Sequence, residues 1–168
     1  NDNEIHTALA DRSLDAAFVT THSSRRGATT VPIYREPLVA AIPRDHELAT
    51  HDFLLWDLLR DQTLLTQGWE GSHSAREFYA SLLGNSVSFS SHAASKQSVM
   101  ALVGAGFGIT LAGRGQAEVV FPGVVYRPIR EHDAWLQVEL AWLPRREDAP
   151  VGRFIAFMRD EAQSRRLL

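Results

Sequence analysis

Three polar segments each follow a stretch of apolar residues that is typical of a buried strand. Thr20-Thr21-His22 follows the first, Thr66-Gln67-Gly68-Trp69 follows the second, and the segment from His92 to Ser95 follows the third. In open α/β sheets, ligands bind outside the carboxyl ends of the strands. The hydroxyl, amide, imidazole and indole groups of these segments therefore predict a site for a small molecule.

Two of these segments lead directly into predicted helices, one at residues 72–74 and one at Ser95. Free backbone N–H groups and the positive end of the helix dipole favour an anion or a carboxylate at such a place. The alternative is purely structural, because polar residues cap helices in every α/β protein. Both interpretations stay open at the level of these residues.

Two other patterns resemble known sites but have the wrong spacing or order. His46 and His51 resemble a zinc-protease pair, yet they are five residues apart, so on a helix their rings would point about 140° away from each other. A metal needs both rings on one face. Gly104-x-Gly106-x-Gly108 resembles a dinucleotide loop, which needs a strand before the glycines and a helix after them. Here the predicted order is reversed, so we expect these glycines to end a helix.

Nucleophilic catalysis has little support in the residues present. Seven histidines and many serines could supply a base and a nucleophile, but Gly71-Ser72-His73-Ser74 lacks the GxSxG pattern of a nucleophile elbow. Cysteine is absent, which excludes disulfides, thiolate zinc sites and cysteine nucleophiles. We therefore predict no catalytic residue, no metal site and no cofactor.

The composition fits one ordinary domain or two small lobes. The chain has 168 residues, of which 45% are hydrophobic, and its 17 basic and 20 acidic residues leave a net charge of -3. Binding to nucleic acid phosphates calls for a basic surplus or a basic stripe, and the sequence shows neither. The arginine pairs at 25–26, 145–146 and 165–166 fall in predicted loops or at a chain end, where solvated charge is expected. No apolar run approaches the length of a membrane span.

Helical and strand-like segments alternate along the chain, which predicts an α/β fold. Caps and apolar periodicity predict helices over residues 3–10, 52–59, 74–83, 95–103 and 151–163. Apolar runs or alternation predict strands over residues 14–19, 31–42, 63–66, 87–90, 109–112, 124–129 and 137–143. The first predicted helix begins within three residues of the chain start, and this end of the chain has few strand–helix–strand units for a doubly wound sheet. We therefore expect a piece of a longer protein whose first lobe is incomplete.

The order of three segments resembles a known family. Leu14-Asp15-Ala16-Ala17-Phe18 comes first, Glu36-Pro37-Leu38-Val39-Ala40-Ala41-Ile42-Pro43 with His46-Glu47-Leu48-Ala49 comes second, and residues 102–111 (LVGAGFGITL) come third. In this order they resemble the effector-binding domain of LysR-type transcriptional regulators. The resemblance is collinear and covers essentially the whole chain.

The resemblance implies a two-lobed, type II periplasmic-binding-protein-like α/β fold with two crossing strands. Residues 1–43 and 137–168 would form a partial first lobe, and residues 44–136 the second. It further implies an effector-sensing domain that binds a small metabolite, a carboxylate or an aromatic compound, between the lobes. The conformational shift would be relayed to a winged helix-turn-helix domain outside this chain, the only part to touch DNA, in a cytoplasmic homodimer or homotetramer without membrane contact.

The predicted ligand contacts combine this resemblance with the polar segments described above. They are Thr20 and Thr21 from the first lobe, and Thr66, Gln67, Trp69, His92, Ser95 and Phe107 from the second. Thr66 and Gln67 would hydrogen-bond the ligand, whereas Trp69 and Phe107 would supply apolar walls.

Two other functions compete with this hypothesis. One is a solute-binding protein of a transport system with a similar fold, which predicts a signal segment upstream in place of a helix-turn-helix. The other is a hydrolase that uses serine and histidine, for which a single Ser→Ala change would abolish turnover.

Overall fold

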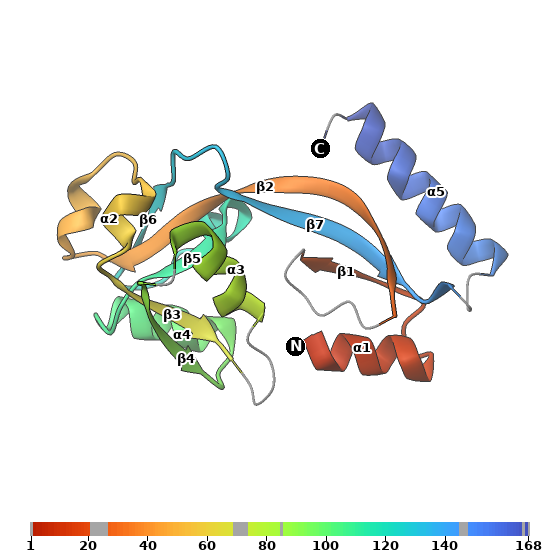
Figure 1. The fold of residues 1–168 in the computed structure, drawn as a ribbon, viewed down its shortest axis with the longest axis horizontal. Coiled ribbons are helices and arrows are strands. Elements are labelled where there is room, and N and C mark those ends of the chain that lie inside the picture. Colours follow the sequence, from red (N-terminus) through yellow and green to blue (C-terminus); the bar gives the residue numbers. More distant parts are fainter. Residues whose placement is uncertain are drawn as a thin grey trace. The chain divides into compact units, whose positions relative to one another are not determined.

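The structure is a computed structural model, and it describes residues 2–20, 27–68, 74–84, 86–144, 148–165 and 167. Helices and strands alternate along the chain, as predicted (Figure 1). The elements are α1 (Asp2–Asp11), β1 (Ala16–Thr20), β2 (Thr29–Pro43), η1 (Glu47–Thr50), α2 (Trp56–Leu59), β3 (Thr63–Gln67), α3 (Ser74–Leu83), β4 (Ser88–His92), α4 (Lys96–Gly104), β5 (Thr110–Gly113), η2 (Arg114–Glu118), β6 (Val124–Pro128), β7 (Trp135–Trp142) and α5 (Ala149–Ser164). No helix of the described segments is long and apolar enough to cross a membrane.

The chain divides into two compact units. Unit 1 comprises Asn1–Arg35 and Leu136–Leu168, and unit 2 comprises Glu36–Trp135. The boundaries therefore fall within β2 and just after the first residue of β7, so each of these strands contributes to both units.

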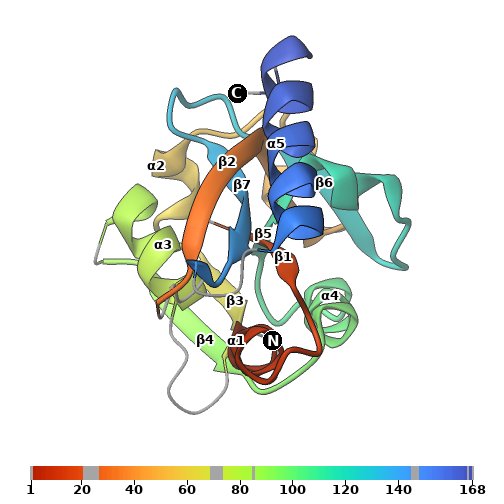
Figure 2. The same ribbon diagram turned by 90° about the vertical axis from the view of Figure 1, so that its right-hand side faces the viewer.

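Unit 1 is built on β1, β7 and the first part of β2. β1 runs antiparallel to β7, with Ala16 opposite Trp142 and Thr20 opposite Val138. One buried cluster joins the strands to α5, and its members are Ile33, Leu140, Trp142, Val151, Ile155 and Ala162. Figures 1 and 2 show α1 at the other side of these strands from α5. Unit 1 is thus a small sheet with one helix on each side.

Unit 2 contains the remainder of β2, which pairs with β5 along one edge and with β6 along the other. Its residues Ala40, Ala41 and Ile42 are fully buried, which explains the unbroken apolar run of this segment. β3 and β4 form a separate parallel pair, and Leu64 of β3 bridges to Ile109. The core of unit 2 packs α4 against these strands through Val39, Ala41, Leu65, Val99, Met100, Val103, Ala112 and Val124.

The glycines after α4 confirm the prediction that they end a helix. Gly106 has a φ of +85°, a conformation that glycine adopts without strain. At Gly108, a Cβ atom would lie 2.5 Å from the carbonyl oxygen of Thr63. The pattern therefore serves the turn from α4 into β5 and its close approach to β3.

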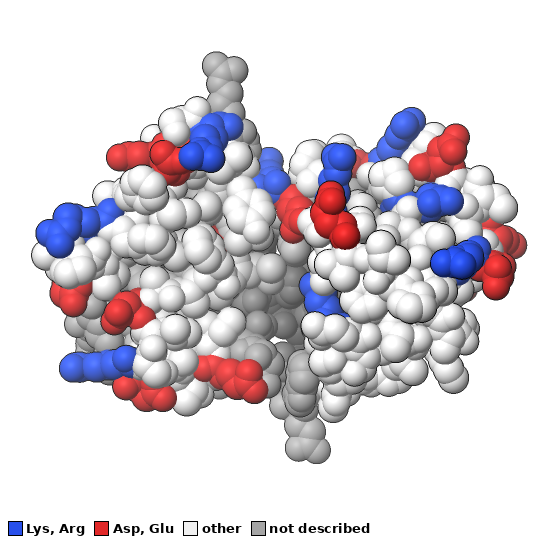
Figure 3. Space-filling view, turned by 180° about the vertical axis from the view of Figure 1, so that it is seen from behind, with Lys and Arg blue, Asp and Glu red and all other residues white. Residues whose placement is uncertain are grey.

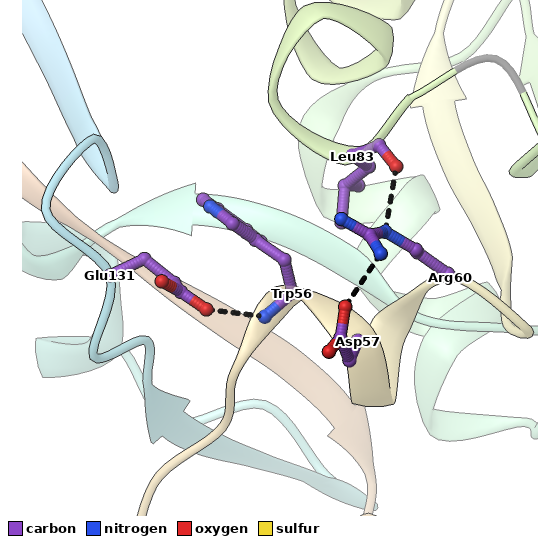
Figure 4. Close-up of polar contacts among 5 residues, drawn as sticks. All are labelled: Trp56, Asp57, Arg60, Leu83 and Glu131. Carbon is purple, nitrogen blue, oxygen red and sulfur yellow. Dashed lines mark hydrogen bonds and ion pairs between the residues drawn. The ribbon is translucent and has the colours of Figure 1, made fainter.

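The prediction of a helix over residues 52–59 with Asp52 as its cap was too long. The α-helix covers only Trp56–Leu59, and its N-cap residue, Leu55, makes no side-chain capping bond. The cap comes instead from a distant residue, because the Trp56 backbone N–H donates to Glu131 Oε1 over 3.1 Å (Figure 4). At the other end of α2, Arg60 donates to the carbonyl of Leu83 and pairs with Asp57.

We expect Met100→Ala to lower the free energy of unfolding by about 2–5 kcal/mol, because the side chain is 1% exposed and its loss leaves a cavity. Gln97→Ala in the exposed part of the same helix should change it by about 0.5 kcal/mol or less. Urea unfolding measures both, and equal effects would contradict the packing of α4.

Burial raises the pKa of Tyr79 to about 12. The unfolded chain titrates at the ordinary value of 10.0, so it loses the phenolic proton first as the pH rises. The stability that comes from the neutral Tyr79 is complete below pH 10.0 and should be lost as the pH rises towards about 12. Desolvation also raises the pKa of Tyr126. Absorbance titration of the folded chain should therefore be compared with that of Tyr79→Phe, which should lack the step near pH 12 and keep the step of Tyr126.

Candidate functional site

The carboxyl ends of β3 and β4 meet at one edge of their parallel sheet. In the register of this pair, Thr66 lies opposite Ser91 and Gln67 lies opposite His92. Ser95 follows β4 by three residues and is the N-cap of α4. The structure therefore brings together four of the predicted contact residues, Thr66, Gln67, His92 and Ser95, in unit 2. We call these four residues the polar edge.

The side chains of two members of the polar edge make hydrogen bonds that order it. Thr66 is only 2% exposed, and its hydroxyl lies 3.0 Å from the hydroxyl of Ser91. Gln67 Nε2 donates to the carbonyl oxygen of Ala94 over 2.9 Å. The buried Thr66 thus links β3 to β4. The half-buried Gln67 links the end of β3 to the loop that leads to α4.

His92 is half-buried, and its Nε2 atom lies 3.0 Å from the hydroxyl of Ser90. This contact fixes the ring against β4. Ser90 and Ser91 were not among the predicted contacts, although they belong to the same strand as His92. The sequence contained one signal for both residues, because they directly precede His92 where a predicted strand ends at the site.

Ser95 confirms its predicted capping role. Its Oγ accepts from the Ser98 backbone N–H over 3.1 Å and lies 2.9 Å from Ser98 Oγ. The first residue of α4 is Lys96, whose pKa is lowered by desolvation, an effect that the Glu36 carboxylate partly offsets. The polar edge therefore ends at the N-terminus of α4, whose first residue is a cation close enough to Glu36 for their charges to interact.

Phe107 does not lie at this edge. Phe107 follows the C-terminal end of α4, and nine helical residues separate it from Ser95, a rise of about 13 Å. Phe107 is 67% exposed. It lies near the start of β3, because Leu64 of β3 bridges to Ile109, two residues after Phe107. Thr20 is the last residue of β1 in unit 1. Thr21 and Trp69 lie outside the described residues.

The histidine and acidic side chains of the described residues bear on a metal centre, and the charges on the face drawn in Figure 3 bear on a basic surface. Among the described residues, no group of three or more histidine and acidic side chains is arranged to hold a metal ion. His46 instead caps η1, since its Nδ1 accepts from the Leu48 backbone N–H over 3.2 Å. On the face shown in Figure 3, acidic and basic side chains are interspersed.

The sequence and the structure are both similar to known regulators. The chain is 25% identical over 114 residues to the HTH-type transcriptional regulator XapR of Escherichia coli (strain K12), an alignment that covers 62% of this chain and 36% of XapR. The chain thus spans only about a third of the length of that relative.

Three solved structures illustrate the structural similarity. CbnR, a LysR family transcriptional regulator, matches with a TM-score of 0.81 at 17% identity, covering 96% of this chain and 57% of CbnR. The BenM effector binding domain with its effector benzoate matches with a TM-score of 0.76 at 19% identity, covering 99% and 77%. The reduced OxyR regulatory domain from Pseudomonas aeruginosa matches with a TM-score of 0.73 at 21% identity, covering 95% and 77%.

These similarities confirm the predicted α/β fold of the type II periplasmic-binding-protein class. The family model for the LysR substrate binding domain matches residues 1–163. It therefore includes β1 to β7 and most of α5 in one continuous match. The chain belongs to the LysR substrate binding domain family.

Proposed function

We propose that the chain is the effector-sensing regulatory domain of a LysR-type transcriptional regulator. The observation that carries this proposal is the family match over residues 1–163. Its relative XapR is by name a regulator of the helix-turn-helix type. DNA binding is assigned to a winged helix-turn-helix domain outside this chain, consistent with the net charge of -3.

The proposed effector site uses the polar edge and Lys96 in unit 2, with Thr20, Thr21 and Trp69 as further contacts. Gln67 and His92 supply hydrogen-bonding groups at adjacent register positions. Lys96 supplies a positive charge at the first turn of α4. A metabolite with a carboxylate group suits this set, because a carboxylate accepts from amide, imidazole and ammonium donors.

The proposed mechanism is a shift between arrangements of the two units. An effector can shift such an equilibrium only by its difference in affinity for the two arrangements. Hydrogen bonds and charge contacts that form fully in one arrangement supply that difference. The shift would reach the DNA-binding domains within a cytoplasmic homodimer or homotetramer, without catalytic turnover of the effector.

The upstream coding sequence separates this function from a transport-associated solute-binding protein. We expect a winged helix-turn-helix domain and a linker helix there. A signal segment in their place would favour the transport function. Turnover of a bound metabolite, abolished by one Ser→Ala change, would favour a hydrolase.

We expect Gln67→Ala to weaken binding of small carboxylates to the full-length protein. Loss of one side-chain hydrogen bond costs about 1 kcal/mol, so the Kd should rise about fivefold. Carboxylic acids and aromatic acids found in a thermal-shift screen are the ligands, and calorimetry measures the Kd.

Gln62→Ala is the matched control for this experiment, since Gln62 immediately precedes β3 at its other end. It should leave the Kd unchanged. An equal loss of affinity in both variants, or no loss in Gln67→Ala, would contradict the assignment of the polar edge.

The isolated 168-residue chain should not bind duplex DNA, because its charge is net negative. Fluorescence anisotropy with a labelled promoter fragment at low salt measures this. The full-length protein is the positive control. Binding by the isolated chain that weakens with added salt would show a phosphate-contacting surface and would contradict the proposal.

A further inference from the structure

Three parallel strands of unit 2 end on the same side of their sheet, and the polar edge uses only two of them. β5 runs parallel to β3, because Leu64 forms a parallel bridge with Ile109, the residue before β5. β5 ends at Gly113, so this glycine lies on the same side as the last residues of β3 and β4. The end of β5 therefore belongs to the surroundings of the polar edge.

Glu36 places a carboxylate at the end of β5. β2 runs antiparallel to β5 with Leu38 opposite Gly113, so Glu36 lies just beyond this pair. Its Oε1 accepts from the Gly115 backbone N–H. A Cβ at Gly115 would be 2.8 Å from Oε1, and one at Gly113 would lie closer still to Oε2. The two glycines thus leave the space that the carboxylate occupies.

Lys96 brings a positive charge close to this carboxylate. It is the first residue of α4 and directly follows Ser95 of the polar edge. Desolvation lowers the pKa of Lys96, and the charge of Glu36 raises it. Within the described segments, however, Lys96 and Glu36 do not form an ion pair with each other, and Arg114, between the two glycines, forms none with Glu36. The two opposite charges therefore interact without direct contact.

A cation and an anion in one site select for the charge pattern of a ligand. The Lys96 ammonium attracts a carboxylate, whereas the Glu36 carboxylate repels it and attracts a cation. Gln67 and His92 add hydrogen-bonding groups at adjacent register positions. A ligand with one charge gains from one of the two charged residues and loses from the other, but a ligand with both charges gains from each.

We propose that the effector is a zwitterion of the α-amino acid type, with its carboxylate at Lys96 and Gln67 and its ammonium group at Glu36. This inference rests on the proposed function, since it names the effector class of the same site. The Gln67 amide has two N–H donors, of which one is directed at Ala94. The Glu36 carboxylate has acceptor positions beyond the one that Gly115 uses. Each charged group of the ligand thus meets an opposite charge, and each finds a hydrogen-bonding partner.

Calorimetry of the full-length protein with matched ligands tests the charge pattern. Each standard α-amino acid is compared with the acid that lacks its amino group and the amine that lacks its carboxylate, for example L-alanine with propanoate and ethylamine. We expect at least one amino acid to bind about tenfold more tightly than both matched compounds, because each of them loses one charged hydrogen bond.

Binding of a matched acid as tightly as its amino acid would overturn this inference and leave the proposed function standing. Binding of no amino acid would overturn it as well. Failure of the proposed function has a different readout, namely the absence of a helix-turn-helix domain from the upstream coding sequence.

Glu36→Gln tests the residue assigned to the ammonium group. Glutamine keeps the size of the side chain and an oxygen that can accept from Gly115, but it removes the charge. The Kd of the amino acid should rise about tenfold, whereas that of the matched acid should stay unchanged or fall. Glu47→Gln is the matched control, since Glu47 follows the opposite end of β2, and it should change neither Kd. Equal rises for both ligands in Glu36→Gln would overturn the assignment.

Gly113→Ala tests the position of the carboxylate without removing its charge. Gly113 has φ -69° and ψ 150°, which alanine adopts readily, so the added methyl group meets the Glu36 carboxylate and not a strained backbone. Melting curves without ligand establish that each variant is folded. The Kd of the amino acid should rise in Gly113→Ala, and the change should add nothing in the Glu36→Gln background. Unchanged affinity in Gly113→Ala, or additive losses in the double variant, would overturn the proposal.

Discussion

β2 is hydrogen-bonded along both of its edges, and both units depend on this pairing. It pairs with β7, and its later residues lie between β5 and β6. Residues 40–42 are fully buried as a consequence, whereas Ile33 contributes to the separate core of unit 1. A strand that belongs to two cores must keep its register in both.

The parallel register of β3 and β4 plays a comparable role for the candidate site. It places Gln67 opposite His92, and the three residues after β4 then lead to the N-cap of α4. The contacts of Thr66 with Ser91 and of Gln67 with Ala94 keep this edge ordered. A preorganised set of donors reduces the side-chain ordering that binding requires. The site is therefore supported by the same contacts that join the two strands.

Local signals predicted most of the elements and part of the candidate site. The alternation of strands and helices, the Ser95 cap and the helix end at the glycines are encoded within a few residues of each feature. The extent of α2 is not, because its capping carboxylate, Glu131, lies 75 residues away in the sequence. The separation of Phe107 from Ser95 already follows from the helix predicted over residues 95–103, which α4 confirms, so a local signal was present for it. The hydrogen bond from the Gly115 backbone N–H to the Glu36 carboxylate joins residues 79 positions apart, so no local pattern in the sequence predicts it.

The discontinuity of unit 1 determines which unit can be completed first during synthesis, because its two segments flank unit 2 in the sequence. Unit 2 is one continuous stretch, Glu36–Trp135, whereas unit 1 needs β7 and α5, which are synthesised after it. Domains commonly fold as units during synthesis. The inserted unit is thus complete while the edge of β1 that pairs with β7 still awaits its partner. Nascent chains would therefore acquire the polar edge before they acquire a finished first unit.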